Sequence, residues 1–223
     1  MKQIATFHSP FQTKFGIPRQ AGVVQTLSGT IVFEKDYRSI DAIRGMEDFD
    51  YLWLIWCFSA NSHSAKGVTV RPPRLGGNKQ LGVFATRSPF RPNPIGLSSV
   101  RIERIDYDCP DAPVIHVLGA DLMDGTPIYD IKPYIPYTDS HPEARGGFTD
   151  SVSWQPLNVE IPEQISTLLT REGIDIETLR EVLSQDPRPQ YHNDADRVYG
   201  MPYGAHDIRF KVNDDTLTVI EIS

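Results

Sequence analysis

Residues 81–105 read LGVFATRSPFRPNPIGLSSVRIERI and place a stiff connection between two apolar runs. The runs at 81–86 and 95–105 are short and rich in aliphatic and β-branched residues, which is typical of strands. Between them Pro89, Pro92 and Pro94 restrict the backbone and disfavour a helical conformation for the residues that precede them. The stretch therefore predicts two strands joined by a rigid, extended turn.

Runs of the same kind fill most of the first 150 residues. Further strands are expected at 4–7, 27–35, 50–58, 68–72 and 113–122, and a short helix at 36–49, with Asp36 or Ser39 near its start and Gly45 near its end. Many short strands at this spacing favour a mainly β fold, a β-barrel or a sandwich rather than a doubly wound sheet. The dinucleotide fingerprint GxGxxG is absent, so a nucleotide-like cofactor would have to be held in another way.

A different pattern begins near residue 156, after a proline-rich run at 130–148 that predicts a long ordered loop. Helices are expected at 162–173 and 175–187, the second with Asp175 as its N-cap. The segments IRFKV and TLTVIEI around residues 213–215 predict a terminal β-hairpin. We therefore divide the chain into a β-rich domain, residues 1–155, and a small α+β domain, residues 156–223.

Composition narrows the class of protein. Of 223 residues, 39% are hydrophobic and 23% are charged, which is ordinary for a soluble globular protein. No apolar run reaches the roughly 20 residues that span a bilayer, and residues 1–20 lack the pattern of a signal peptide. Neither the two cysteines nor the six histidines have metal-ligand spacing. A cytoplasmic protein with reduced thiols and no metal is expected.

Charge is distributed unevenly along the chain. The net charge is −7, but the window between Asp50 and Glu103 contains no acidic residue and carries +7, which leaves −14 for the remainder. Its cations are Lys66, Arg71, Arg74, Lys79, Arg87, Arg91 and Arg101. A basic centre in an acidic chain suggests a local anionic target. The alternative is that folding spreads these side chains over different faces.

The proline-rich connection itself suits a ligand. Pre-ordering by proline lowers the entropic cost of presenting Arg87 and Arg91 to a carboxylate or a phosphate. Phe90 and Asn93 suit a flat heterocycle, through stacking and paired hydrogen bonds. The alternative is a rigid connection whose arginines only solvate it.

Several long motifs along the chain together resemble one family. ATRSPFRPNPIGLSSVRI is similar to the signature of the TsaA-like (TrmO) family, SAM-dependent tRNA adenine-37 N-methyltransferases, where SAM is S-adenosylmethionine. SPFQTKFGIPRQ, GMEDFDYLWLIWCF, VRPPRLGG, DLMDGTPIYDIKPYIPY and DPRPQYH agree in the same order. The resemblance implies a β-barrel methyltransferase domain, a small C-terminal domain and a homodimer. It also implies SAM-binding residues: Pro18, Arg19, Gln20, Ser59, Ala60, Arg87, Leu97, Asp124, Gly125, Thr126 and Pro127.

The chemistry of these residue types suits the parts of SAM. Arg19 or Arg87 could bind the cofactor's carboxylate, and Asp124 could accept a ribose hydroxyl or a positive group. Gly125 permits a close approach of the backbone. Ser59 and Ala60 are small where relatives can carry larger polar residues, so contacts there would come from the backbone.

The substrate that the resemblance implies is tRNA carrying N-threonylcarbamoyladenosine at position 37, methylated on its 6-nitrogen. That base lies in the single-stranded anticodon loop, so it is reached with little unpairing. The cations expected to contact tRNA are Lys66, Arg71, Arg74, Lys79 and Arg91. The sequence assigns no catalytic residue, although Asp130 is a candidate base.

Two other classes stay open at this point. A non-enzymatic RNA-binding barrel would need the basic window and stacking groups but no small-molecule pocket. An anion-handling enzyme such as a phosphoesterase would need clustered Asp and His ligands, which the spacing does not provide.

Overall fold

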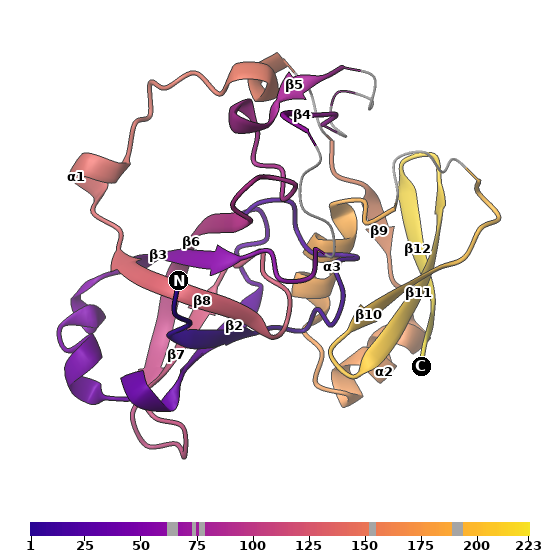
Figure 1. Ribbon diagram of the computed structural model, residues 1–223. Coiled ribbons are helices and arrows are strands. Elements are labelled where there is room, and N and C mark those ends of the chain that lie inside the picture. The colour runs from indigo at the N-terminus through magenta and orange to yellow at the C-terminus, as the bar shows by residue number, and fades with distance from the viewer. Residues whose placement is uncertain (62–66, 73–74, 76–78, 152–154, 189–193) are drawn as a thin grey trace.

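The computed structural model describes residues 1–61, 67–72, 75, 79–151, 155–188 and 194–223. Six antiparallel strands form its larger sheet, and each pairs with two neighbours in the order β1-β2-β7-β6-β3-β8. Because β8 also pairs with β1, the sheet closes into a barrel (Figure 1). The strands are β1 (Ala5–His8), β2 (Ser28–Phe33), β3 (Tyr51–Cys57), β6 (Ile95–Asp106), β7 (Val114–Leu118) and β8 (Thr126–Pro133). The expected mainly β fold is confirmed.

Buried and more exposed side chains alternate along these strands, and the buried ones form the barrel core. In β3 the side chains of Leu52, Leu54 and Trp56 are buried, while the residues between them are more exposed. Successive side chains of a strand point to opposite faces, so a run with this period fills the interior with every second residue. These three side chains pack in one cluster with residues of the other five strands, such as Phe7 and Ile128.

The chain around the proline-rich connection contains less strand than expected. The run at 81–86 gives only β5 (Leu81–Gly82), which pairs with β4 (Thr69–Val70) and is followed by a 3-10 helix, η5 (Val83–Ala85). The run at 68–72 is likewise reduced to β4. Only two residues of each strand are paired. Pro72, just beyond β4, has no backbone N–H to donate, so the ladder of hydrogen bonds is not extended there.

The helix expected at 36–49 is wrong. The segment forms three 3-10 helices, η1 (Lys35–Tyr37), η2 (Ile40–Ile43) and η3 (Met46–Asp48). Ser39 caps η2 by accepting a hydrogen bond from the backbone N–H of Asp41, and Gly45 adopts a left-handed conformation with φ of 84°. Ser39 is extended, with φ of −142° and ψ of 133°, so the chain leaves the helical conformation at Ser39 as well as at Gly45 and no continuous helix forms.

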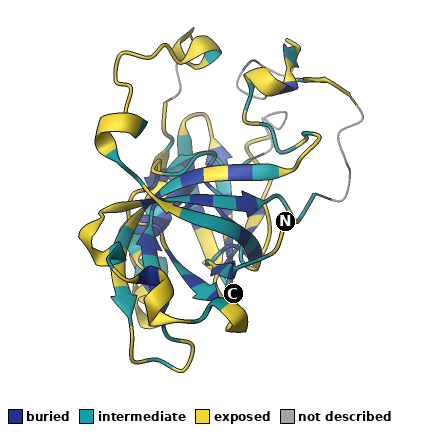
Figure 2. Cartoon of the chain, turned by 60° about the vertical axis from the view of Figure 1, so that its left-hand side comes forward, coloured by how far each residue is buried: buried dark blue, intermediate teal, exposed yellow. Residues whose placement is uncertain are grey.

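The proline-rich run at 130–148 is only partly a loop. Its start belongs to β8, and α1 (Pro136–Asp139) follows. Asp139 anchors this turn by accepting hydrogen bonds from the backbone N–H of Ile135 and from Nε1 of Trp53. Residues 141–147 are all exposed, and Figure 2 shows the segment arching away from the barrel before it reaches η6 (Gly147–Ser151).

The C-terminal part combines a four-stranded sheet with two helices, α2 (Glu163–Arg171) and α3 (Ile176–Ser184). The sheet has the order β10-β11-β12-β9, with strands β9 (Asn158–Glu160), β10 (Tyr199–Tyr203), β11 (His206–Asn213) and β12 (Thr216–Ile222). The expected hairpin is β11–β12, and Asp175 caps α3 through a 2.7 Å hydrogen bond from the backbone N–H of Thr178. The strand β10 was not expected, because its sequence YGMPY contains glycine and proline.

The segment between β1 and β2 belongs to the core of the C-terminal part rather than to the barrel core. Phe11, Val24 and Leu27 are buried in the same cluster as Leu179 and Phe210. Phe11 also meets the ring of Tyr203 edge-on, with ring centroids 5.6 Å apart. The segment therefore carries residues 14–20 along the junction between the two parts of the chain.

Candidate functional site

A cavity of about 460 Å³ opens at the end of the barrel, which is within the range of small-molecule sites. Five segments surround it: residues 14–20, the end of β3 with residues 58–61, the loop 86–91, the start of β6, and residues 121–126. Its lining residues are Lys14, Ile17, Pro18, Arg19, Gln20, Trp53, Trp56, Cys57, Phe58, Ser59, Ala60, Asn61, Thr86, Arg87, Pro89, Arg91, Ile95, Gly96, Leu97, Asp121, Met123 and Thr126. Eight of the eleven residues expected to bind SAM are among them.

Trp56 and Gly96 form an apolar wall of this cavity. The two residues are paired across β3 and β6, and the indole lies so close that a Cβ on Gly96 would be 2.2 Å from Cε2 of Trp56. Phe58 packs against the same indole with ring centroids 4.3 Å apart. The absence of a side chain at 96 thus lets the indole lie against the backbone of β6.

The proline-rich connection folds over one side of the cavity. Arg91 donates hydrogen bonds from Nη1 to the carbonyl oxygens of Thr86 at 2.9 Å and Ser88 at 3.3 Å. Arg91 therefore braces its own loop, a structural use that competes with the expected contact to substrate. Phe90 and Asn93 are exposed and do not line the cavity.

Arg87 joins two of the motifs that the resemblance singled out. Its Nη1 donates a 2.5 Å hydrogen bond to Oε1 of Gln20, which lies 67 residues earlier in the chain. On the neighbouring side, Lys14 donates to Oδ1 of Asn61 at 2.8 Å. Segments that are far apart in sequence are therefore tied together around the cavity mouth by side-chain hydrogen bonds.

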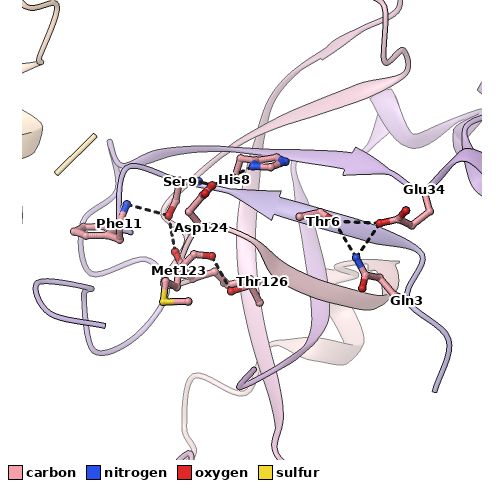
Figure 3. A network of polar contacts seen from close by, with 10 residues as sticks. Gln3, Thr6, His8, Ser9, Phe11, Glu34, Met123, Asp124 and Thr126 are labelled. Carbon is pink, nitrogen blue, oxygen red and sulfur yellow. Dashed lines mark hydrogen bonds and ion pairs between the residues drawn. The ribbon is translucent and has the colours of Figure 1, made fainter. Parts of the chain in front are cut away.

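Asp124, Gly125 and Pro127 do not line the cavity, in contrast to Thr126. Oδ1 of Asp124 lies 3.0 Å from Nδ1 of His8 and accepts a hydrogen bond from the backbone N–H of Ser9 (Figure 3). The hydroxyl of Ser9 donates in turn to the carbonyl oxygen of Leu122 at 2.9 Å. This network fixes the loop before β8 against the end of β1, so Asp124 already has partners within the protein.

An acidic residue that the sequence did not single out lies in the cavity instead. Oδ1 of Asp121 accepts a 2.5 Å hydrogen bond from the hydroxyl of Ser98, which accepts one from Nε1 of Trp56 at 3.0 Å. Burial raises the pKa of Asp121, while the hydrogen bonds from Ser98 and from the backbone of Ala21 oppose that shift. In the sequence, the signal that could have identified Asp121 was the presence of a carboxylate inside the apolar run 113–122.

The basic window does not form one surface in the described part of the chain. Arg71 and Lys79 are exposed beside the short pair β4–β5, whereas Arg101 lies opposite Tyr51 further along the barrel. Lys66 and Arg74 lie outside the described residues. Asp130 pairs with Lys132 at 2.9 Å and does not line the cavity.

The described residues contain no group of three or more His, Cys, Asp or Glu side chains arranged to hold a metal ion. None of their helices is both long and apolar enough to cross a bilayer.

Comparison with known proteins matches two family models, the tRNA-methyltransferase O N-terminal domain at residues 6–140 and the TrmO C-terminal domain at residues 154–223. A tRNA (adenine(37)-N6)-methyltransferase of Escherichia coli (strain K12) is 40% identical over 96% of this chain and 93% of its own. A relative from Pseudomonas aeruginosa, provisionally named an S-adenosylmethionine-dependent methyltransferase, is 36% identical over 99% of this chain and 96% of its own. The crystal structure of TrmO from Pseudomonas aeruginosa superposes with a TM-score of 0.80 at 30% identity, covering 100% of this chain and 96% of that one. The chain therefore belongs to the tRNA-methyltransferase O family.

Proposed function

We propose that this protein is a SAM-dependent methyltransferase that acts on the 6-nitrogen of adenine 37 in tRNA carrying the threonylcarbamoyl modification. The names of its relatives support methylation of adenine 37 in tRNA and the use of SAM. The observation that carries the proposal is the cavity, in which eight of the eleven expected SAM-binding residues meet although they come from five separate segments. A simple RNA-binding barrel would have no need of such a site.

The cavity residues suit the parts of SAM. Arg87 offers a guanidinium to the carboxylate, and Gln20 holds that guanidinium in place. Trp56 and Phe58 give an apolar, aromatic surface suited to the adenine ring. Pro18, Arg19, Ser59, Ala60, Leu97 and Thr126 complete the proposed site, whereas Asp124, Gly125 and Pro127 would act on it through the position of the loop. SAM supplies an electrophilic methyl group on a sulfonium.

The contribution of the protein to the reaction is mainly orientation. A fixed cofactor and a fixed adenine turn a bimolecular reaction into an effectively unimolecular one, which can account for about 7–11 kcal/mol of the barrier. The apolar walls of the cavity exclude water from the reacting groups. Braced loops such as 86–91 serve this purpose, because they lose little further freedom when the ligands bind.

The proposed tRNA-binding residues are Lys66, Arg71, Arg74, Lys79 and Arg91. Arg71 and Lys79 are exposed, so they can contact phosphates. Arg91 would have to give up its hydrogen bond to the carbonyl oxygen of Thr86 in order to bind substrate. The acidic remainder of the chain would discourage non-specific contacts with nucleic acid. The target base lies in a single-stranded loop, so extrusion from a duplex is not required.

We further propose a homodimer located in the cytoplasm, with the chain divided near residue 155. The exposed arm at 141–147 and the exposed side chain of Leu97, at 57% beside the cavity, are surfaces that a second copy could cover. Sedimentation equilibrium of the purified protein measures the mass of the assembly. A monomeric mass at micromolar concentration would contradict the dimer.

The function is tested by calorimetric titration with SAM, followed by methyl-transfer assays on tRNA with and without threonylcarbamoyladenosine. We expect saturable binding of SAM without RNA, and transfer only to the modified tRNA. Equal transfer to both tRNAs would contradict the proposed substrate but not the enzyme class. If SAM did not bind in the presence or absence of tRNA, the RNA-binding alternative would be favoured.

A further inference from the structure

The cavity contains a carboxylate, Asp121, that forms no ion pair with a cation in the part of the chain that the structure describes. Of the described residues that line the cavity, Asp121 is the only acid, among the cations Lys14, Arg19, Arg87 and Arg91. Arg87 is close enough to influence Asp121 electrostatically, but its Nη1 is bonded to Gln20. A buried charge without a partner is costly, so proteins keep such groups where a ligand or a proton completes them.

Asp121 is also held in a fixed position. Its Oδ1 is the end of a chain of hydrogen bonds that starts at the indole of Trp56 in the barrel and passes through the hydroxyl of Ser98. The backbone N–H of Ala21 adds a contact from the segment that carries the motif 18–20. Each carboxylate oxygen can accept about two hydrogen bonds, so a residue that lines the cavity keeps acceptor capacity for a ligand.

The amino-acid end of SAM carries two opposite charges on one carbon atom, a carboxylate and an ammonium. The cavity contains an arginine suited to the first, Arg87, and one acid suited to the second. Asp124 is a less suitable acid, because it contacts His8 and Ser9 and does not line the cavity. The sulfonium is a poorer partner for Asp121, since it has no N–H or O–H group to donate.

We infer that Asp121 binds the α-ammonium group of the cofactor, while Arg87 binds its carboxylate. This inference rests on the proposed function, since it assumes that the cavity binds SAM. It assigns to Asp121 a role in affinity and orientation, because a charge-assisted contact at the amino-acid end fixes one end of the cofactor.

The test compares three ligands that differ in the relevant groups. SAM has the ammonium, the carboxylate and the sulfonium. S-adenosylhomocysteine lacks the transferable methyl group and with it the sulfonium charge, and 5′-methylthioadenosine is an uncharged thioether that lacks the whole amino-acid end. Calorimetric titrations are made with the wild type, with Asp121→Asn and with Asp36→Asn, which replaces an exposed carboxylate that is not part of the cavity lining. Asparagine keeps the shape of the side chain and its acceptor for Ser98.

We expect Asp121→Asn to bind both SAM and S-adenosylhomocysteine about 10- to 100-fold more weakly, and methylthioadenosine as tightly as the wild type. Loss of a negative charge would not weaken the binding of a carboxylate, so this pattern identifies the ammonium. Asp36→Asn should bind all three ligands like the wild type.

Three outcomes would overturn the inference. Weaker binding of SAM alone would assign Asp121 to the sulfonium, and equal weakening of all three ligands would show that Asp121 only supports the shape of the cavity. Unchanged binding of all three would show that the ammonium has another partner. Failure of the wild type to bind any of them is a separate result, which would contradict the proposed use of SAM itself.

Discussion

The hydroxyl of Ser98 in β6 donates a 2.5 Å hydrogen bond to Oδ1 of Asp121, in the connection between β7 and β8. Ser98 is buried, and its oxygen also accepts from Nε1 of Trp56. One hydroxyl therefore couples an aromatic wall of the cavity to its only described acid. The hydrogen bond from Ser98 ties Asp121 to a barrel strand outside its own loop, which holds it as a fixed point of attachment for a ligand.

Asp121→Asn should make the protein without ligand more stable at neutral pH, because it removes a charge that is costly to bury. The pKa of Asp121 is raised in the folded protein, so the folded state retains a proton that the unfolded state releases. The wild type should therefore lose stability as pH rises from the ordinary aspartate pKa of 3.8 through the raised value, and the variant should not lose this contribution. Thermal unfolding across pH measures the difference.

In that experiment the two proteins should differ least near about pH 4 and most near about pH 8. Asp36→Asn provides the control for the loss of an exposed carboxylate outside the cavity lining. A variant that is less stable than the wild type at about pH 8 would mean that the hydrogen bonds of the carboxylate outweigh its burial.

Gly96→Ala should lower both stability and the affinity for SAM. The new Cβ would overlap the indole of Trp56, which cannot withdraw easily because Ser98 and Phe58 hold it. Overpacking of this kind typically costs about 1–3 kcal/mol. Chemical denaturation and calorimetry measure the two effects.

Gly82→Ala is the matched control for that variant. Its φ of −59° suits alanine, and a Cβ there would have no atom within 4 Å. The Gly82 variant should therefore resemble the wild type in both measurements. If both glycine variants behaved alike, close approach of Trp56 to the backbone of β6 would not be important for the site.

Much of the fold could be predicted from local patterns. In β3 and β11 every second residue is buried, and the expected strands lie where the sequence alternates. Asp175 before an amphipathic run marks the start of α3 correctly. In contrast, β10 contains Gly200 and Pro202 and becomes a strand only because β11 pairs with it, a long-range effect that local propensity does not contain.

The site was also only partly predictable, because local sequence patterns do not show tertiary contacts. The stretch 86–91 indicated ligand binding by its composition, and the family resemblance added residues 18–20, but their meeting through Gln20 and Arg87 is a tertiary contact. Asp121 and Asp124 are three residues apart and equally polar, and only the structure shows which of them lines the cavity. A turn signature identifies a loop without showing which of its side chains points inward.

Arg71→Ala and Lys79→Ala should each weaken tRNA binding at low salt and leave SAM binding unchanged. Both residues are exposed beside β4–β5 and do not line the cavity. Each phosphate contact releases counterions, so loss of one should reduce the slope of log affinity against log salt by about 0.7–1. Filter binding at several salt concentrations gives this slope. An unchanged slope in both variants would place the tRNA on another face.

Asp175→Ala should destabilise the C-terminal part by about 1 kcal/mol, because the backbone N–H of Thr178 loses its acceptor. The pKa of Asp175 is lowered by hydrogen bonds from the side chain and the backbone of Thr178. The charged form therefore contributes stability above the ordinary aspartate pKa of 3.8, and this contribution disappears as pH falls through the lowered value. Asp175→Asn, which keeps an acceptor, should lose much less. Urea denaturation at neutral and acidic pH compares the two variants with the wild type. If both variants unfolded at the same urea concentration as the wild type at neutral pH, the cap would not contribute to stability.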